Sequence, residues 1–253
     1  MAGLPHSPHA LVTGGAKGIG REIASTLTRS GAIVTVLGRD QMALERVVAA
    51  GAARFAVVAD VTDPAEVNTA IAEASARQKI DILVANAGAA ESAPFAKSDA
   101  ALFARMIGVN FMGVVHAIQA VLPSMQNRPY GRVIVVASTA GLKGYAYASA
   151  YCAAKHAVIG LVRSLALELA TTGVTVNAVC PGFTDTDLVA GSIDNIIKKT
   201  GRSQAQAVAE LTKHNPQGRL VIPAEVADAV LWLCGEGASA VTGQAIAIAG
   251  GEI

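Results

Sequence analysis

The chain has 253 residues, of which 52% are hydrophobic and 15% charged, so it is long enough to bury the core of one sizeable α/β domain. Its 20 Lys and Arg and 19 Asp and Glu give a net charge of +1, which argues against a nucleic-acid-binding face and against an acidic tail. The start lacks the charged segment and apolar run of a secretory signal, and no later apolar run approaches membrane-spanning length, so we expect a cytoplasmic protein that does not contact a membrane.

Short β-branched runs alternate with longer helical stretches along the whole chain. The runs predict strands at 10–13, 33–37, 55–59, 81–85, 132–137, 174–179 and 245–249. Apolar residues at three- and four-residue spacing predict helices at 18–29, 41–50, 64–77, 99–126, 151–170 and 223–234. This alternation predicts an α/β fold, in which residues 1–253 form a single doubly wound Rossmann domain with a seven-stranded parallel sheet and helices on both faces.

One long polar stretch interrupts this alternation at about 184–222, after the sixth strand. Because it follows the carboxyl end of a strand, where doubly wound sheets bind ligands, we expect it to form a substrate lid. The three cysteines, Cys152, Cys180 and Cys234, are odd in number and far apart. They predict small core residues rather than a disulfide framework or a metal site.

The first chemical motif is "VTGGAKGIG", residues 12–20, which follows the first strand and opens a helix. Gly14 can make the tight turn off the strand, Gly18 lets the backbone approach a pyrophosphate, and Gly20 lets the helix lie close on the sheet. The amide groups at the start of the helix then face the phosphates. The motif therefore predicts a dinucleotide-binding site, although the glycine spacing is not that of G-x-G-x-x-G.

The end of the second strand, "VTVLGRD", decides which dinucleotide is favoured. Gly38 stands where a carboxylate would bond the adenosine ribose, and Arg39 follows with a guanidinium suited to phosphate. Lys17, in the glycine turn, can approach the same phosphate, so we expect NADP(H) to be preferred over NAD(H). In the alternative interpretation Arg39 is a solvated cap residue and Lys17 a surface charge, and Asp40 could reach the ribose.

The stretch "SAYCAAK" places Tyr151 and Lys155 four residues apart in a predicted helix, so their side chains share one face. A nearby ammonium favours phenolate, so Lys155 is expected to lower the pKa of Tyr151 from its ordinary value near ~10. Such a tyrosine can exchange a proton with a carbonyl or alcohol oxygen while hydride moves to or from nicotinamide. Tyr145 and Tyr147 have no lysine four residues on and are assigned to pocket lining or packing.

Two further polar residues are candidates for the same site. Ser138 ends a buried strand thirteen positions before Tyr151, where a hydroxyl can bond the substrate oxygen. Asn110 lies among apolar residues of the predicted helix 99–126, where a buried amide needs partners. A water that feeds protons to Lys155 would supply them, and the alternative is a helix kink satisfied by its own backbone.

The order and spacing of these pieces resemble the short-chain dehydrogenase/reductase family over nearly the full length of the chain. The matching pieces are "TGGAKGIG", "DV" at Asp60 and Val61, "NAG" at 86–88, "YCAAK" and "PGFTDT" at 181–186. The resemblance implies a catalytic tetrad of Asn110, Ser138, Tyr151 and Lys155 and a homotetramer that pairs the helices 99–126 and 151–170. It also implies cofactor contacts, with Asp60 on the adenine, at Gly14, Lys17, Gly18, Ile19, Gly20, Arg39, Asp60, Val61, Asn86, Gly88, Pro181, Gly182, Thr184 and Thr186.

Two positions depart from the family pattern. Ala85 stands before "NAG" where another asparagine is usual, which puts a ribose contact in doubt. Thr184 stands where an aliphatic residue is usual, which could change how the nicotinamide carboxamide is held.

The stretch "SLALELATTGVTVNAVCPGFTDTDL" is similar to the 3-oxoacyl-thioester reductases and polyketide ketoreductases of this family, so the expected substrate is a 3-oxoacyl or 3-hydroxyacyl group linked to coenzyme A or a carrier protein. Residues 191–219 hold two acids, Asp194 and Glu210, and five bases that could meet the phosphates of such a carrier or form a solvated face: Lys198, Lys199, Arg202, Lys213 and Arg219.

Two other functions are weighed against the thioester reductase. The first is a dehydrogenase of a free cyclic, steroid or sugar alcohol. The second is a nucleotide-sensing protein without turnover, against which the intact set of Ser138, Tyr151 and Lys155 argues.

Overall fold

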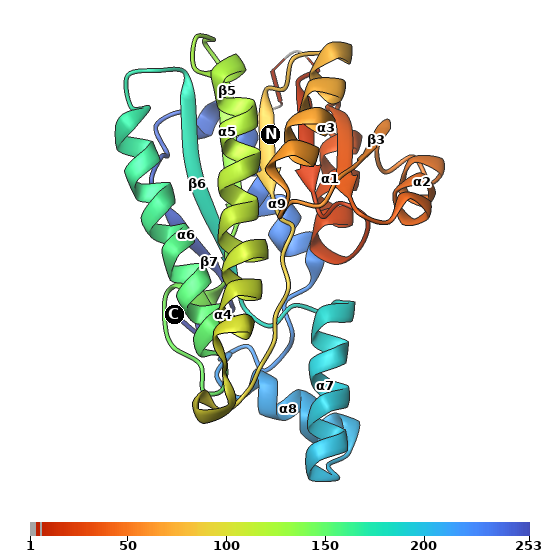
Figure 1. Ribbon diagram of the computed structural model, residues 1–253, viewed down its shortest axis with the longest axis vertical. Helices are drawn as coiled ribbons and strands as arrows, with labels where there is room; N and C mark the ends of the chain where they lie inside the picture. Colours follow the sequence, from red (N-terminus) through yellow and green to blue (C-terminus); the bar gives the residue numbers. More distant parts are fainter. Residues whose placement is uncertain (1–3, 6) are drawn as a thin grey trace.

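A computed structural model describes residues 4, 5 and 7–253 of the chain. Its centre is the predicted sheet of seven parallel strands in the order β3-β2-β1-β4-β5-β6-β7 (Figure 1). The order reverses between β1 and β4, which is the switch point at which doubly wound sheets bind ligands. The strands are β1 (His9–Thr13), β2 (Ile33–Gly38), β3 (Phe55–Val58), β4 (Ile82–Ala85), β5 (Gly131–Val136), β6 (Val174–Pro181) and β7 (Ala245–Ile248).

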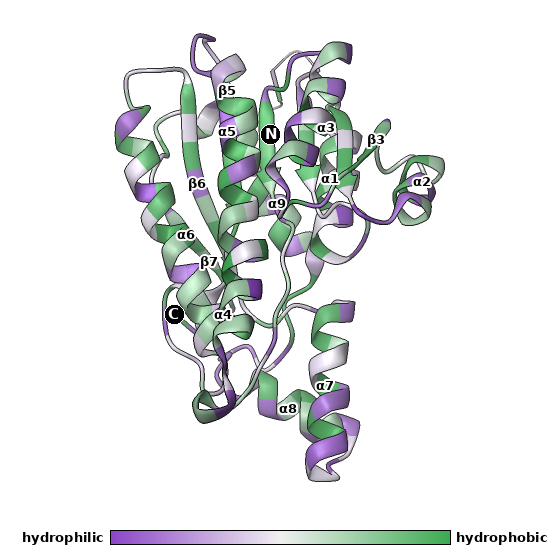
Figure 2. Cartoon of the chain, in the orientation of Figure 1, coloured by the Kyte–Doolittle hydropathy of each residue, from purple (hydrophilic) through white to green (hydrophobic). Residues whose placement is uncertain are grey.

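Helices cover both faces of the sheet, as predicted, and each face has its own apolar cluster. One cluster joins the sheet to α3, α5 and α6, and the other joins it to α1, α2 and α9. Figure 2 shows hydrophobic residues concentrated along the strands and hydrophilic ones on the outer faces of the helices. The helices on the sheet are α1 (Gly18–Arg29), α2 (Gln41–Ala49), α3 (Pro64–Arg77), α5 (Gly113–Met125), α6 (Ser149–Glu168) and α9 (Pro223–Cys234), and α4 (Ala100–Ile107) packs against α6.

The predicted helix 99–126 is interrupted. A π-helical stretch, Gly108–Met112, separates α4 from α5, and Asn110 lies at its centre. The predicted helix 151–170 in turn begins two residues earlier, at Ser149. The predicted strand and helix positions otherwise agree with the structure to within two residues. The three cysteines are free and buried, as predicted.

Two helical runs, Ala100–Met125 and Ser149–Glu168, are long and apolar enough to cross a membrane by length and composition alone. The expectation that no apolar run reaches that length is therefore wrong. Both runs pack in the fold as core helices, with α4 against α6 and with α5 and α6 on one face of the sheet. Of their most apolar windows, 39% and 44% is buried, so each also carries apolar surface that the chain leaves uncovered.

Residues 184–222, called the lid segment below, form a helical hairpin of α7 (Asp187–Thr200) and α8 (Gln204–Thr212). The hairpin extends beyond the carboxyl edge of the sheet (Figure 1). Its base is closed by a bridge between Thr184 and Val221, and its helices share a small apolar cluster around Val189, Ile193 and Ala207. This cluster is separate from the two that hold the sheet and its helices.

Candidate active site

The glycine turn after β1 has a backbone that larger residues would strain. Gly14 and Gly18 have φ of +65° and +52°, which is the left-handed region. A Cβ on Gly20 would lie 2.3 Å from the Gly14 carbonyl oxygen and 2.4 Å from Nδ2 of Asn86. Gly20 therefore lets α1 start against the turn itself, where the sequence predicted a close approach to the sheet. Lys17 is exposed and precedes the first residue of α1.

Asn86 braces this turn from the end of β4. Its Nδ2 donates to the carbonyl oxygens of Thr13 and Gly14, at 3.0 and 3.2 Å, and its backbone N–H donates to Oγ1 of Thr13. The amide group that the sequence assigned to cofactor contact is thus used inside the protein. What Asn86 can offer a ligand is its side-chain oxygen and its carbonyl.

Arg39 and Asp60 meet at the carboxyl ends of β2 and β3. Nη1 of Arg39 lies 3.3 Å from Oδ2 of Asp60, while the Arg39 side chain stays 78% exposed. Burial raises the pKa of Asp60, but hydrogen bonds from Thr62 and the charge of Arg39 outweigh it, so that the pKa lies below its ordinary value. Asp40 caps α2 through the backbone N–H of Ala43. The cap position predicted as an alternative for Arg39 thus belongs to Asp40, which leaves Arg39 pointing into solvent beside Asp60.

Asn110 is fully buried and satisfied by backbone groups. Nδ2 donates to the carbonyl oxygens of Met106 and Ala89, at 3.0 and 2.9 Å, and Oδ1 accepts from the N–H of Ala89 at 3.3 Å. Because Met106 lies one turn earlier in the same helix, its carbonyl is taken from the regular helical pattern where the π-helical stretch begins. The alternative expectation, an irregular helix that satisfies Asn110 by its own backbone, is met in part: a π-helical stretch is present and Met106 is one partner, but Ala89 is the other and ties the helix to the loop after β4.

Gly88 separates two of the predicted catalytic residues. A Cβ at this position would lie 2.8 Å from Oδ1 of Asn110 and 3.9 Å from Nζ of Lys155. The predicted cofactor-binding glycine is thus also required by packing. The absence of a side chain at Gly88 leaves room for the side chains of both Asn110 and Lys155.

Ser138, Tyr151 and Lys155 gather where β5 ends and α6 begins. Ser138 caps a short 3₁₀ turn, and its Oγ accepts the N–H of Ala140 at 3.1 Å. Tyr151 is half-buried in the first turn of α6, and Lys155 lies one turn further with 4% of its surface exposed. Nζ of Lys155 donates to the carbonyl oxygen of Val136 at 2.9 Å and lies 5.8 Å from the centre of the Tyr151 ring.

The expectation that Lys155 lowers the pKa of Tyr151 is wrong in this arrangement. Burial raises the pKa of Tyr151, and only the Ser138 hydroxyl lowers it. Burial also lowers the pKa of Lys155 to about 8, because the ammonium loses water and gains one carbonyl. Desolvation is therefore the largest influence on the pKa of both groups, which sequence spacing alone could not reveal.

The "PGFTDT" loop closes the site from the end of β6. The N–H of Gly182 donates to the Ile248 carbonyl oxygen at 3.0 Å, and the Thr184 hydroxyl donates back to the Gly182 carbonyl at the same distance. Thr184 is 3% exposed, so its departure from an aliphatic residue is accounted for by this bond. Cγ2 of Thr186 would lie 3.3 Å from a Cβ on Gly18, which brings this loop onto the glycine turn.

Glu252 is a site residue that the sequence reasoning missed. Its Oε1 accepts the Tyr145 hydroxyl at 2.6 Å and lies 2.8 Å from Nζ of Lys143, and the Tyr145 hydroxyl also meets Oγ1 of Thr139 at 2.7 Å. Tyr145 thus lines and packs as predicted, whereas Tyr147 is 67% exposed with φ of +66°. No local pattern could have found Glu252, because 107 residues separate it from Tyr145.

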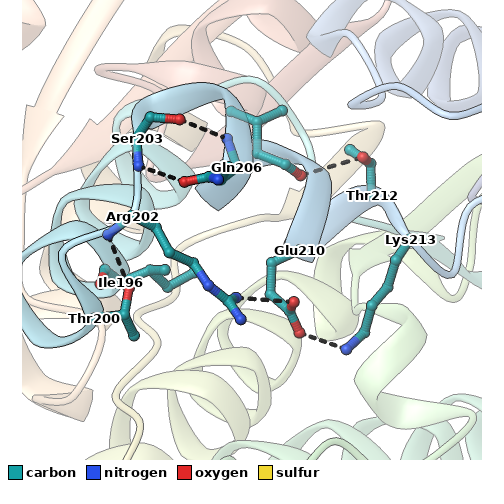
Figure 3. Close-up of polar contacts among 9 residues, drawn as sticks. Ile196, Thr200, Arg202, Ser203, Gln206, Glu210, Thr212 and Lys213 are labelled. Carbon is teal, nitrogen blue, oxygen red and sulfur yellow. Dashed lines mark hydrogen bonds and ion pairs between the residues drawn. The ribbon is translucent and has the colours of Figure 1, made fainter.

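The positive charges of the lid segment are largely paired. Figure 3 shows Arg202 and Lys213 both bound to Glu210, and the same view shows Ser203 and Gln206 capping α8. Arg219 makes a two-pronged contact with Glu225 of α9, at 2.6 and 2.9 Å. Three of the five predicted bases are therefore held in ion pairs, and these pairs reduce the positive charge of the segment without cancelling it. Lys198 and Lys199, at the end of α7, remain exposed.

Comparisons with known proteins agree with this architecture. A family model described as short chain dehydrogenase matches residues 8–197. A "Putative ketoacyl reductase" of Streptomyces coelicolor is 38% identical over 96% of this chain and 95% of its own. A D-beta-hydroxybutyrate dehydrogenase of Rhizobium meliloti is 34% identical over 96% of this chain and 97% of its own.

Among solved structures, a variant of actinorhodin polyketide ketoreductase with NADPH has a TM-score of 0.93 and 36% identity, and the match covers 97% of each chain. These proteins are named as reductases of ketones or as a dehydrogenase of an alcohol, the solved structure is of a complex with NADPH, and the matches extend over nearly all of this chain. The chain belongs to the short-chain dehydrogenase family and is an oxidoreductase acting between a ketone and an alcohol.

Proposed function

We propose that the protein is an NADP(H)-dependent reductase of 3-oxoacyl thioesters, with Asn110, Ser138, Tyr151 and Lys155 as its catalytic set. The observation that carries this proposal is the gathering of Ser138, Tyr151 and Lys155 at the end of β5. That position faces the same sheet edge as the glycine turn. A substrate carbonyl bound between this group and the glycine turn would meet the hydroxyl groups of Ser138 and Tyr151 and the buried amine of Lys155.

The glycine turn fits a dinucleotide. The N–H of Gly14 is taken by the Leu37 carbonyl oxygen at 2.7 Å, whereas Gly18 and Ile19, in the first turn of α1, would offer their backbone N–H groups to a pyrophosphate. Asp60 and Val61 would face the adenine, and Pro181, Gly182 and Thr186 the nicotinamide end. When bound, the nicotinamide supplies or accepts the hydride.

The chain's own residues would handle the oxygen and its proton. In the reducing direction, the hydroxyls of Ser138 and Tyr151 donate hydrogen bonds to the carbonyl oxygen, and the Tyr151 proton moves to that oxygen as negative charge develops. Because burial raises the pKa of Tyr151, the residue enters the reaction protonated at neutral pH. Ser138 stabilises both the developing alkoxide and the tyrosinate that follows.

Lys155 would return the proton to Tyr151. Burial lowers its pKa to about 8, so the amine can release and take up a proton near neutral pH. Oδ1 of Asn110 and Nζ of Lys155 both lie near the position that a Cβ would take on Gly88, and this Oδ1 is the acceptor around which a water relay would be ordered. Asn110 would thus act as a positioning residue for that water.

The preference for NADP(H) would rest on Arg39 and Lys17. The Arg39 guanidinium is held by Asp60 at one nitrogen and is otherwise exposed, which leaves donors for a 2′-phosphate. Changing Arg39→Asp should lower the ratio of kcat/KM for NADPH over NADH by about a hundredfold. The matched control is Arg46→Asp in the last turn of α2. An unchanged ratio in the Arg39 variant would remove the phosphate contact from the proposal.

The similarity to ketoacyl reductases supports a thioester substrate. Initial rates of NADPH and NADH oxidation with acetoacetyl-CoA test this directly. We expect turnover that favours NADPH. Turnover confined to free ketones would instead support the alternative, a dehydrogenase of a cyclic, steroid or sugar alcohol or, as in the Rhizobium relative, of a hydroxy acid. Binding of NADPH without turnover of any ketone would favour the nucleotide-sensing alternative.

The same proposal extends to a cytoplasmic homotetramer. Apolar surface remains uncovered on the two long helical runs, and Leu167 of α6 is 81% exposed. Pairing α4, α5 and α6 with those of other subunits would cover it. Light scattering at micromolar concentration should give four times the mass of the chain, whereas the mass of one chain would contradict the assembly.

A further inference from the structure

A second polar cluster begins at Thr139, the residue after Ser138. It consists of Thr139, Lys143, Tyr145 and Glu252, joined by the contacts described above. Phe183, at the start of the lid segment's stem, packs edge-on against Tyr145 with ring centres 5.8 Å apart. The cluster therefore joins three segments around the candidate site: the loop after β5, the loop after β6 and the end of the chain.

The Glu252 carboxylate is held on one side. Its side chain is 3% exposed, and Oε1 takes both the Tyr145 hydroxyl and the Lys143 ammonium. Oε2 lies 3.2 Å from the position a Cβ would take on Gly182. Among the hydrogen bonds of the described residues, none ends on Oε2. A negative charge thus sits beside the loop that is assigned to the nicotinamide end of the cofactor.

The end of the chain is locked where it is by the base of the lid segment. Gly250 and Gly251 have φ of +62° and +93°. A Cβ on Gly250 would lie 2.1 Å from Oδ1 of Asn215, and one on Gly251 would lie 3.3 Å from Pro216. Two positions that require glycine therefore hold the backbone just before Glu252 against the lid segment. This contact fixes where the Glu252 carboxylate lies.

Lys143 is the cation of this cluster, and the pair it forms with Glu252 carries no net charge. Without Glu252, the Lys143 ammonium would stand alone two residues before Tyr145 and would attract an anion. A free 3-oxo acid carries a carboxylate two bonds from the reacting carbonyl, whereas a thioester is neutral at that point. The balance between Lys143 and Glu252 can therefore separate the two substrate classes.

We propose that Glu252 is a specificity-determining residue, which cancels the charge of Lys143 and so makes the site reject free 3-oxo carboxylates in favour of neutral 3-oxo thioesters and esters. This inference rests on the proposed function and names the group that separates its two substrate classes.

The test compares two small substrates that differ in this charge: acetoacetate, and the neutral thioester of acetoacetate with N-acetylcysteamine. The measured quantity is the ratio of kcat/KM for acetoacetate to kcat/KM for the thioester, with NADPH. Glu252→Gln keeps an acceptor for Tyr145 but leaves the ammonium uncompensated, so the ratio should rise at least about tenfold. Lys143→Gln leaves the Glu252 carboxylate without its partner cation, so the ratio should fall by a similar factor. Glu236→Gln, an exposed glutamate after α9, should leave it unchanged.

Opposite shifts in the two variants support the inference, because a merely structural loss would move both ratios the same way or not at all. Equal ratios in wild type, Glu252→Gln and Lys143→Gln would overturn it. If Glu252→Gln does not fold, the Lys143→Gln result decides, since Lys143 is part-exposed and its loss leaves Tyr145 bonded to Glu252. Wild-type protein that reduces neither substrate would instead contradict the proposed function, so the two failures are distinguishable.

Discussion

The carboxyl edge of the sheet and the lid segment are built from different kinds of contact. At the edge, backbone and small residues interlock: Gly14 and Gly20 leave room only for hydrogen, and Asn86 ties the turn to β4. In the lid segment, two short helices share a small apolar cluster, and the polar contacts are ion pairs at the surface.

This difference separates what is costly to change from what is not. A Cβ held about 2 Å from a carbonyl oxygen must displace the backbone, whereas an exposed ion pair contributes about 0–1 kcal/mol. The groups proposed to bind the cofactor and move the proton are thus fixed by packing, and the segment proposed to meet the rest of the substrate is fixed weakly. Such a division lets substrate preference change without loss of the chemistry.

The largest effect is expected from Tyr151→Phe at the packed edge. Removing the hydroxyl takes away the proposed proton donor and leaves the ring in place, so kcat should fall by about 10³-fold while the Kd for NADPH stays nearly constant. Steady-state rates and a fluorescence titration with NADPH give the two quantities. Tyr147→Phe, in the exposed loop before α6, is the control and should keep its activity. If Tyr151→Phe kept more than about a tenth of kcat, the assignment would be wrong.

Two glycine substitutions, one at the sheet edge and one in the lid segment, test this difference through the free energy of unfolding. Gly20→Ala should lower the free energy of unfolding by about 3 kcal/mol, because its Cβ would overlap the Gly14 carbonyl and Asn86. Gly191→Ala in α7 meets no heavy atom within 4 Å among the described residues. It should raise helix stability by about 0.5–1 kcal/mol. Urea unfolding measures both, and equal losses in the two variants would contradict the contrast.

Lys155 gives a pH dependence to stability. Its pKa is about 8 in the folded chain and 10.5 as an ordinary lysine, so between these values the unfolded chain binds more protons. The contribution of Lys155 to the free energy of unfolding therefore rises with pH across this window. Lys155→Met lacks the titrating group, so wild type should gain about 2 kcal/mol relative to it between pH 7.5 and 10. A difference that is flat across these pH values would show that the amine is not desolvated.

The sequence predicted most of what lies along one strand-turn-helix unit and little of what joins distant segments. The seven strands, the glycine turn and the Tyr151–Lys155 pair are local patterns, and the structure places all of them where their spacing indicates. The Lys155 ammonium donates to the Val136 carbonyl oxygen in a buried place, and the spacing of residues in the sequence predicts neither this partner nor this burial. One hydrogen-bond partner of Asn110, Ala89, is 21 residues away, and one partner of Tyr145, Glu252, is 107 residues away.

The charge of the lid segment was likewise not predictable from the sequence, because a count of its bases does not show which acids pair with them. Glu210 binds Arg202 and Lys213 at once, so Glu210→Gln would free two positive charges. The loss of stability should be small, since these ion pairs are exposed. If phosphates of a substrate carrier meet this surface, the KM for acetoacetyl-CoA should fall about twofold to threefold at low salt while that for the neutral thioester stays constant. Asp194→Asn, on the exposed part of α7, is the matched control. A KM that falls equally for both thioesters would show that the change acts on the lid's position and not through its charge.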